Sequence, residues 1–173
     1  MSDANGNPIH EIYHTGLRNM HAVEMTAIEL TERQVERLEH YPEMAMRLRQ
    51  HRTESEQQAQ RLDAILQRHG SSTSTAKNAV SSVMGNVAAA MHMPASDEIL
   101  KNTFANFAFE HQEIASYTSL IAMAERIGDT ASIGALRQSL AEEEAMATFI
   151  GQQIVPTTQR YMDLTAAGEK AKV

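Results

Sequence analysis

The sequence predicts an all-α protein, built as a four-helix bundle with one long crossover. Its 173 residues suit a single domain with a sizeable core. Aromatic residues make up only 5% of the chain, and residues that favour helix over sheet are abundant. Four long segments repeat apolar residues at three- and four-residue steps, which is helical spacing.

The first two segments predict a helical hairpin. After a flexible N-terminus of residues 1–8, the first helix is expected over about 9–39. The second is expected over about 43–69, with Pro42 at its start, where proline is tolerated, and a stop at Gly70. The apolar stripe of the first helix is Leu17, Met20, Ala27, Ile28, Val35 and Leu38.

The last two segments predict a second hairpin. A third helix is expected over about 96–127, ending at Gly128. The fourth is expected over about 129–155, because Pro156 should end or kink it. The bundle would then span 9–157, leaving 158–173 as a C-terminal tail.

A long crossover, about 70–95, separates the two hairpins. It opens with a serine/threonine run, which is typical of a linker. The spacing of Val80, Val83, Met84, Val87 and Ala88 predicts a short extra helix within it. Two hairpins joined by one long crossover have the ferritin-like topology, whereas an up-down-up-down bundle needs a short central connection.

Composition excludes several classes of function. The net charge of −7 disfavours binding to nucleic acid, and the absence of cysteine excludes disulfides, thiolate metal sites and cysteine nucleophiles. The N-terminus has no signal-peptide pattern, and no apolar run approaches the roughly 20 residues of a membrane helix. We therefore expect a soluble, cytoplasmic protein without nucleic-acid or membrane partners.

Acidic residues interrupt the apolar stripe of every long segment. A charge in a bundle core is costly unless it is paired or bound to metal. Two of these residues in the first hairpin are 30 positions apart, and so are two in the second, which suggests a pseudo-twofold site. Facing glutamates can bridge two metal ions, and oxygen ligands suit iron, manganese, magnesium or calcium. The residues are Glu24, Glu54, Glu110, Glu113 and Glu143.

Alternatives stay open at this point. A single glutamate beside a helical stripe is more often a flank residue that reaches water. Glu142 is an alternative to Glu143 as the inner residue of the fourth helix. His51, one turn before Glu54, is a further candidate ligand, although a single histidine is more often a hydrogen-bonded or surface residue.

Five local strings point to a known family. They are Ala22-Val23-Glu24, His51-Arg52-Thr53-Glu54-Ser55, Glu110-His111-Gln112-Glu113-Ile114-Ala115-Ser116-Tyr117, Ala124-Glu125-Arg126-Ile127-Gly128 and Leu140-Ala141-Glu142-Glu143-Glu144. They resemble the YciE/YciF-like family of ferritin-like bacterial stress proteins, and the resemblance covers about residues 10–155. It implies a ferritin-like bundle, a homodimer and a rubrerythrin-like dinuclear metal site, with iron first and manganese second. It implies Glu24, Glu54, Glu113 and Glu143 as ligands, with Glu110 as an additional one.

The chain departs from the usual di-iron pattern, in which histidine follows glutamate by three residues on two helices. Gln57 and Met146 stand at these two positions, so iron redox chemistry is in doubt unless His51 substitutes. The leading interpretation is a metal-binding stress protein, with weak oxidase, peroxidase or catalase-like activity as an open question. The alternatives are a non-catalytic structural or interaction protein and, ranked lower, iron storage.

The three phenylalanines of the third segment bear on the expected homodimer. Phe104 and Phe107 share a helical face and are predicted to fill the core. Phe109 lies about 160° from Phe107 around the helix. A second apolar face must be buried, either against a partner chain or beneath the crossover of the same chain.

Overall fold

The computed structural model describes residues 7–73 and 97–171, and these residues form four α-helices without any strand. The helices are α1 (Pro8–Val35), α2 (Pro42–Arg68), α4 (Glu98–Ile127) and α5 (Thr130–Ala166). The prediction of an all-α bundle is therefore confirmed. Residues 1–6, predicted to be flexible, and the short helix predicted within the crossover lie outside the described residues.

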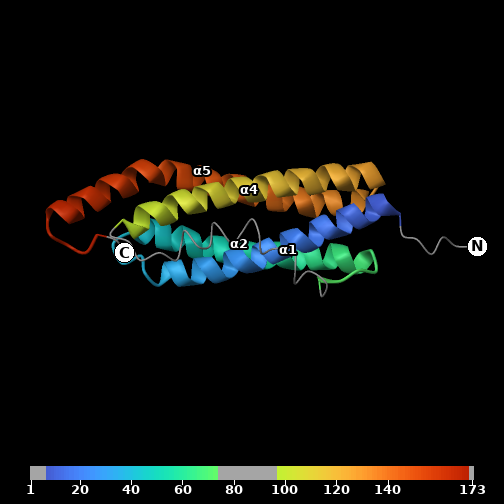
Figure 1. The fold of residues 1–173 in the computed structure, drawn as a ribbon, viewed down its shortest axis with the longest axis horizontal. Helices are drawn as coiled ribbons and strands as arrows, with labels where there is room; N and C mark the ends of the chain where they lie inside the picture. Colours follow the sequence, from blue (N-terminus) through green and yellow to red (C-terminus); the bar gives the residue numbers. More distant parts are fainter. Residues whose placement is uncertain (1–6, 74–96, 172–173) are drawn as a thin grey trace, which may run out of the picture.

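The helices form two antiparallel hairpins that lie side by side, α1 with α2 and α4 with α5 (Figure 1). Contacts between α1 and α4 and between α2 and α5 join the hairpins into one bundle. In Figure 1, α2 ends at the same end of the bundle as the N-terminus, whereas α4 begins at the opposite end. The connection between them therefore joins opposite ends, and α2 and α4 run in the same direction. This is the ferritin-like topology.

Prolines start the helices of the first hairpin, and glycines with positive φ follow the ends of α2, α4 and α5. Pro8 follows Asn7, whose side-chain oxygen accepts a hydrogen bond from the Ile9 amide at 3.1 Å. Gly128 has a φ of 78°, a conformation that L side chains rarely adopt. There the next amide, that of Asp129, donates to the Ala124 carbonyl at 2.9 Å, and the chain turns directly into α5.

Buried apolar side chains form two clusters, one toward each end of the bundle. The first contains Tyr13, Leu17 and Tyr117, and lies toward the start of α1. The second contains Leu48, Ile150 and Leu164, and lies toward the end of α1. The first cluster also reaches past Glu24 to Ala27 and Leu30, so the carboxylates that the sequence singled out lie where the two clusters approach each other.

The predicted end of the fourth helix is wrong, because α5 continues through Pro156 to Ala166. Proline removes one helical hydrogen bond, here that of the Gln152 carbonyl. Both residues are exposed, so water can take the place of the missing amide. Beyond the proline, Leu164 is buried in the second apolar cluster, and the Tyr41 hydroxyl donates to the Ala171 carbonyl at 2.6 Å. Much of the predicted C-terminal tail therefore belongs to the folded bundle.

The orientation predicted for Phe104 and Phe109 is also wrong. Phe109 is 5% exposed and belongs to the first apolar cluster, whereas Phe104 is 51% exposed. Phe107 is half-buried against the second cluster. The reason is helical geometry, because Phe109 precedes the buried Glu113 by one turn and so shares its face. Phe109 therefore packs within its own chain, and the homodimer stays a prediction without this residue as its contact.

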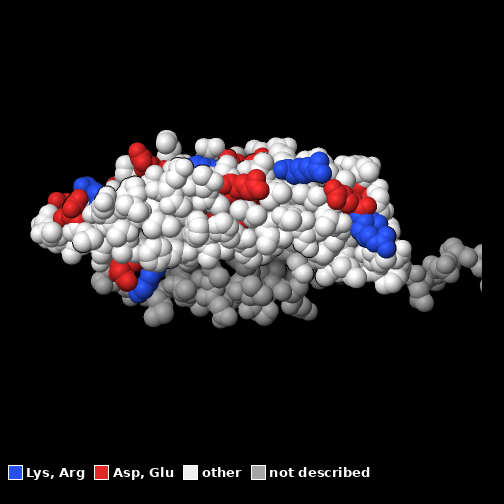
Figure 2. Space-filling model, turned by 90° about the horizontal axis from the view of Figure 1, so that it is seen from above, with Lys and Arg blue, Asp and Glu red and all other residues white. Residues whose placement is uncertain are grey.

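The surface shows mixed charge. On the face seen in Figure 2, acidic and basic side chains are scattered singly or in small groups among uncharged ones. None of the helices in the described part of the chain is long and apolar enough to cross a membrane.

Replacing Phe109 with alanine should lower the free energy of unfolding by about 3–5 kcal/mol, since it leaves a cavity in a packed core. Phe104→Ala, one helical turn and a half away on the exposed side, should change it by less than about 0.5 kcal/mol. Urea unfolding followed by circular dichroism measures both. Similar values for the two variants would contradict the burial of Phe109.

Candidate metal centre

Each helix contributes at least one acidic or imidazole side chain to the middle of the bundle. Glu24 comes from α1, His51 from α2, Glu110 and Glu113 from α4, and Glu143 from α5, and none is more than 4% exposed. Each lies three or four residues from other buried positions of its helix, such as Met20 and Ala27 around Glu24. The helical period that builds the core thus also turns these groups inward.

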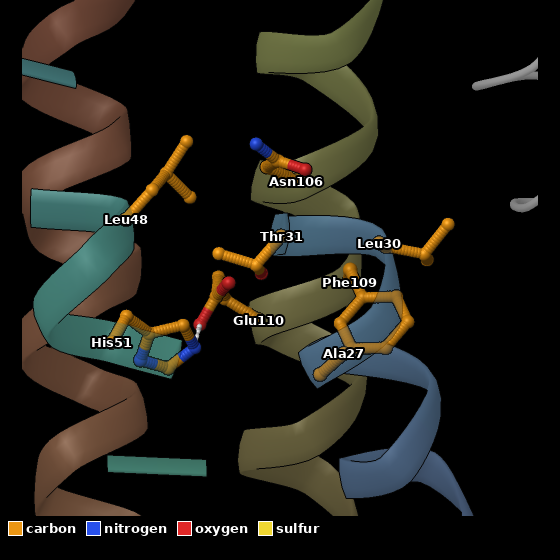
Figure 3. Close-up of a pocket in the computed structure, with 8 residues that line it drawn as sticks. All are labelled: Ala27, Leu30, Thr31, Leu48, His51, Asn106, Phe109 and Glu110. Carbon is orange, nitrogen blue, oxygen red and sulfur yellow. Dashed lines mark ion pairs between the residues drawn. The ribbon is translucent and has the colours of Figure 1, made fainter. Parts of the chain in front are cut away.

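Four of the five side chains are close enough to share one metal ion. Single donor atoms of His51, Glu110, Glu113 and Glu143 all lie within 4.8 Å of one another. His51 Nε2 lies 3.3 Å from Glu110 Oε2 and 3.7 Å from Glu143 Oε2. Figure 3 shows His51 and Glu110 pointing toward each other from α2 and α4.

Glu24 lies at the margin of this cluster and is held by Tyr117. The Tyr117 hydroxyl donates a hydrogen bond of 2.6 Å to Glu24 Oε1. Both side chains are fully buried, and Tyr117 follows Glu113 by one turn of α4. The contact fixes one carboxylate oxygen and leaves the second, Oε2, facing the interior without a hydrogen bond from any described residue.

Glu54, predicted as the α2 ligand, lies at the rim of the bundle instead of within this group of four. Its side chain is 18% exposed, and its Oε2 is 2.9 Å from Arg47 Nη1. Gln50 donates to its other oxygen at 2.8 Å. Burial alone would raise the pKa of Glu54, but hydrogen bonds from His51 and Arg47 lower it to about 2. An ionised Glu54 therefore contacts His51 Nδ1 at 3.2 Å and orients the ring, whose Nε2 faces the cluster.

Glu143, rather than Glu142, is the inner residue of α5. Glu143 is fully buried, whereas Glu142 lies on the flank and pairs with Arg61. Arg61 donates to both Glu142 oxygens, at 2.6 and 2.9 Å, and Gln58 and Gln138 donate at 3.0 Å. Burial opposes ionisation of Glu142, but these donors together hold its pKa below the usual value.

The interior carboxylates repel one another. Burial raises the pKa of Glu24, Glu110 and Glu113 well above the ordinary 4.5, and the charge of Glu143 raises it further. Without a cation, the folded protein therefore holds several protons in this region. His51 is the basic member of the cluster, and the nearby arginines pair with rim carboxylates.

These residues fit a bound metal. When ionised, Glu113 and Glu143 can only accept hydrogen bonds, and their buried oxygens then meet no donor among the residues the structure describes. Buried polar atoms are normally hydrogen-bonded, and a cluster of unpaired ones calls for a ligand. A narrow cavity of about 10 Å³ adjoins His51 and Glu110, with room for about one water molecule (Figure 3). Carboxylate oxygens and one imidazole are donors that iron and manganese accept.

Sequence reasoning missed the roles of two residues. Tyr117 enters the sequence analysis only as the last residue of a family string, although its position one turn after Glu113 places its hydroxyl near the carboxylates. Gln58 is fully buried and donates to Glu142, which helps to keep that carboxylate at the rim. In both cases the available signal was a polar group on a helix face that otherwise points inward.

The fold and the site together define a class: a ferritin-like four-helix bundle with a buried carboxylate–histidine cluster. The chain belongs to the DUF892 family, described as a domain of unknown function, whose model matches residues 8–163.

Solved structures share the fold. A protein of Xanthomonas campestris pv. campestris is 24% identical, with a TM-score of 0.76 over 91% of this chain and 99% of that one. The E. coli stress protein YciF is 18% identical, with a TM-score of 0.73 over 85% and 94%. YcfI of Rhodopseudomonas palustris is 20% identical, with a TM-score of 0.67 over 87% and 98%. The family match over residues 8–163, together with this shared fold, confirms the resemblance to the YciE/YciF-like family.

The interior carboxylates predict the pH dependence of the metal-free protein. With a raised pKa, the folded state binds more protons than the unfolded state above pH 4.5, so the free energy of unfolding falls as pH rises toward the folded pKa. Each such group contributes about 1.4 kcal/mol per pH unit within its interval. His14 and His21 act in the opposite direction below about pH 6.5, since their folded pKa values are lowered.

Glu113→Gln isolates the carboxylate contribution, because it removes one of the raised groups and leaves both histidines in place. Relative to wild type, this variant should be stabilised more at pH 8 than at pH 5. Urea unfolding of chelator-treated protein at the two pH values measures the difference. A difference that is constant or smaller at pH 8 would show that Glu113 does not carry a raised pKa.

Proposed function

We propose that this chain binds a dinuclear metal centre, of iron or manganese, in the middle of its bundle. The proposed ligands are Glu24, His51, Glu110, Glu113 and Glu143. The observation that carries the proposal is the set of buried carboxylate oxygens without hydrogen-bond partners, which come from α1, α4 and α5 and are joined by the unpartnered His51 Nε2 of α2. Unpaired ionised carboxylates are costly in a core, and bound cations remove that cost.

The charge of the ligand set supports two divalent ions rather than one. Four ionised glutamates carry four negative charges, which two divalent cations neutralise, and His51 adds a neutral nitrogen ligand. A carboxylate can bridge two ions through its two oxygens. Both oxygens of Glu113 and of Glu143 are available for this, since neither side chain is engaged elsewhere among the described residues.

The surrounding residues would hold the ligands in place. Glu54 orients His51 through Nδ1, and Tyr117 fixes one oxygen of Glu24 at 2.6 Å. The apolar clusters on both sides limit access of water to the centre. Bound iron or manganese would supply redox chemistry toward oxygen or peroxide. This class of activity fits a stress-associated cytoplasmic protein of the YciF-like family.

One feature favours a second candidate, a non-catalytic structural protein whose cluster binds metal weakly. The di-iron pattern places histidine three residues after a ligand glutamate on two helices. Here Met146 is buried at the α5 position and packs in an apolar cluster, and Gln57 is exposed at the α2 position. The site therefore has one imidazole instead of two.

Neighbouring glutamates of α5 supply a matched pair of variants for the test. Glu143→Gln should weaken iron or manganese binding by more than about 100-fold, since even residues that only orient metal ligands contribute 10–100-fold. Glu142→Gln should leave binding unchanged, because Glu142 pairs with Arg61 at the rim. Equilibrium dialysis of each metal ion, with elemental analysis of the protein, measures both affinity and the number of ions per chain.

Three outcomes separate the candidates. Two ions per chain in wild type, lost in Glu143→Gln alone, support the dinuclear centre. No tightly bound iron or manganese in wild type overturns it and favours the structural protein. Equal loss in both variants would mean that the α5 register assigned to the ligands is wrong.

A further inference from the structure

Three histidines gather at the end of the bundle that carries the start of α1. His10 and His14 lie on the first turns of α1, and His69 follows the last residue of α2. Figure 1 shows that these helix ends and the turn between α4 and α5 lie together. His14 and Glu24 are ten residues apart on α1, so the group lies about 15 Å from the carboxylate cluster along the helix axis.

The three rings are close enough to bind one ion. One ring nitrogen from each lies within 4.8 Å of the other two. The ring centroids of His14 and His69 are 5.1 Å apart, and those of His10 and His14 are 6.3 Å apart. His10 and His14 have the four-residue spacing that places two imidazoles on one helix face, as in helical zinc-binding motifs.

His69 is oriented by an ionised carboxylate. Its Nε2 lies 2.8 Å from Asp129 Oδ2, which also accepts hydrogen bonds from the Tyr13 hydroxyl at 3.1 Å and from the Ser132 hydroxyl. Burial opposes ionisation of Asp129, but the donors Ser132, His69 and Tyr13 lower its pKa. With Nε2–H donated to this carboxylate, the lone pair of neutral His69 is on Nδ1. A carboxylate that orients a metal-binding histidine in this way is a common feature of metal sites.

His14 has a ring nitrogen that is available as a metal ligand. Its Nε2 is buried and has no hydrogen-bond partner in the parts of the chain that the structure describes. Burial, followed by the charge of nearby His69, lowers its pKa, which favours the neutral imidazole that metals bind. The other ring nitrogen, Nδ1, is 3.7 Å from Glu11 Oε1.

We propose that His10, His14 and His69 form a second metal site, which binds Zn²⁺, with Asp129 as the positioning residue for His69. Three neutral imidazoles match the nitrogen preference of zinc, and a water molecule would complete a four-coordinate shell. The oxygen-rich central cluster instead suits harder ions. Bound zinc would tie the first turns of α1 to the end of α2.

Zinc titration of metal-free protein, without a histidine affinity tag, tests this site. His14→Ala should remove one bound Zn²⁺ per chain. His21→Ala is the matched control, since it removes another half-buried histidine of the same helix that lies outside the group. Titrations are repeated in the Glu143→Gln background, so that zinc entering the central cluster is counted separately and failure of either site is recognised independently.

Cobalt supplies a readout of the ligands themselves. Tetrahedral Co²⁺ with nitrogen ligands absorbs visible light far more strongly than six-coordinate Co²⁺ with oxygen ligands. Co²⁺ should therefore give an intense visible band in wild type, Glu143→Gln and His21→Ala, but not in His14→Ala. Addition of Zn²⁺ should remove the band by displacement.

Asp129→Asn tests the positioning role, and His69→Gln replaces the ligand with a side chain that can still donate to Asp129. Asp129→Asn should weaken zinc binding about 10–100-fold while the helical circular dichroism is retained. His69→Gln should abolish the cobalt band, which keeps the test decisive if His14→Ala fails to fold.

Two outcomes for the zinc-site residues would overturn the proposal. One is that Glu143→Gln, with all three histidines intact, binds no zinc. The other is that His14→Ala and His69→Gln bind zinc as wild type does. Equal loss in His21→Ala would overturn it too, since binding would then not depend on these three residues.

Discussion

Charge compensation at the centre of the bundle is the constraint on which the rest of this structure depends. Four glutamates and one histidine are enclosed where the surrounding side chains exclude water. Their ionised forms would repel one another strongly in a medium of low polarity. Either protons or metal cations must therefore be present, and the choice links folding stability to pH and to metal supply. The two apolar clusters lie on both sides of this region and stabilise the fold around it.

The basic residues near the site act at its rim. Arg47 pairs with Glu54, and Arg61 pairs with Glu142 in a two-pronged contact that fixes the carboxylate plane. Each pair joins an arginine and a glutamate that are partly exposed, and among the described residues neither arginine forms an ion pair with an interior glutamate. An arginine inside the cluster would compete with a cation for the same oxygens. The placement of these pairs therefore leaves the inner oxygens available for metal.

Much of this arrangement could be predicted from sequence, because it follows from helical periodicity. Glu24, Glu113 and Glu143 each lie at a three- or four-residue step from apolar neighbours, and all three are buried. The outcome at Glu54 could not be predicted in the same way, because it depends on Arg47, which reaches Glu54 from seven residues earlier in α2.

The continuation of α5 beyond Pro156 was likewise beyond local reasoning. A proline in a helix interior removes a hydrogen bond, and the sequence shows only that cost. The compensating burial of Leu164 and the contact between Tyr41 and Ala171 come from residues far apart in the chain. Long-range contacts of this kind also bring His69 close to His10 and His14. The four-residue spacing relates His10 to His14, but no local pattern relates either of them to His69.

The single imidazole of the site can be understood from the direction of the helices. Because α2 and α4 run in the same direction, residues three positions earlier in each helix are displaced along the bundle axis in the same direction. The displacement is about 4.5 Å in both helices. His51 precedes Glu54 by three residues, and Glu110 precedes Glu113 by three, so His51 and Glu110 lie at one level and meet at 3.3 Å. Histidine three residues after Glu54 would instead stand in place of Gln57, one turn away in the opposite direction and on the exposed side of α2. The pair formed by His51 and Glu110 thus extends the carboxylate cluster toward the start of α4. The adjoining cavity lies there, between Ala27, Leu30 and Phe109 of the first apolar cluster and Leu48 of the second. An exchangeable ligand such as water therefore has room on this side of the centre, next to the imidazole.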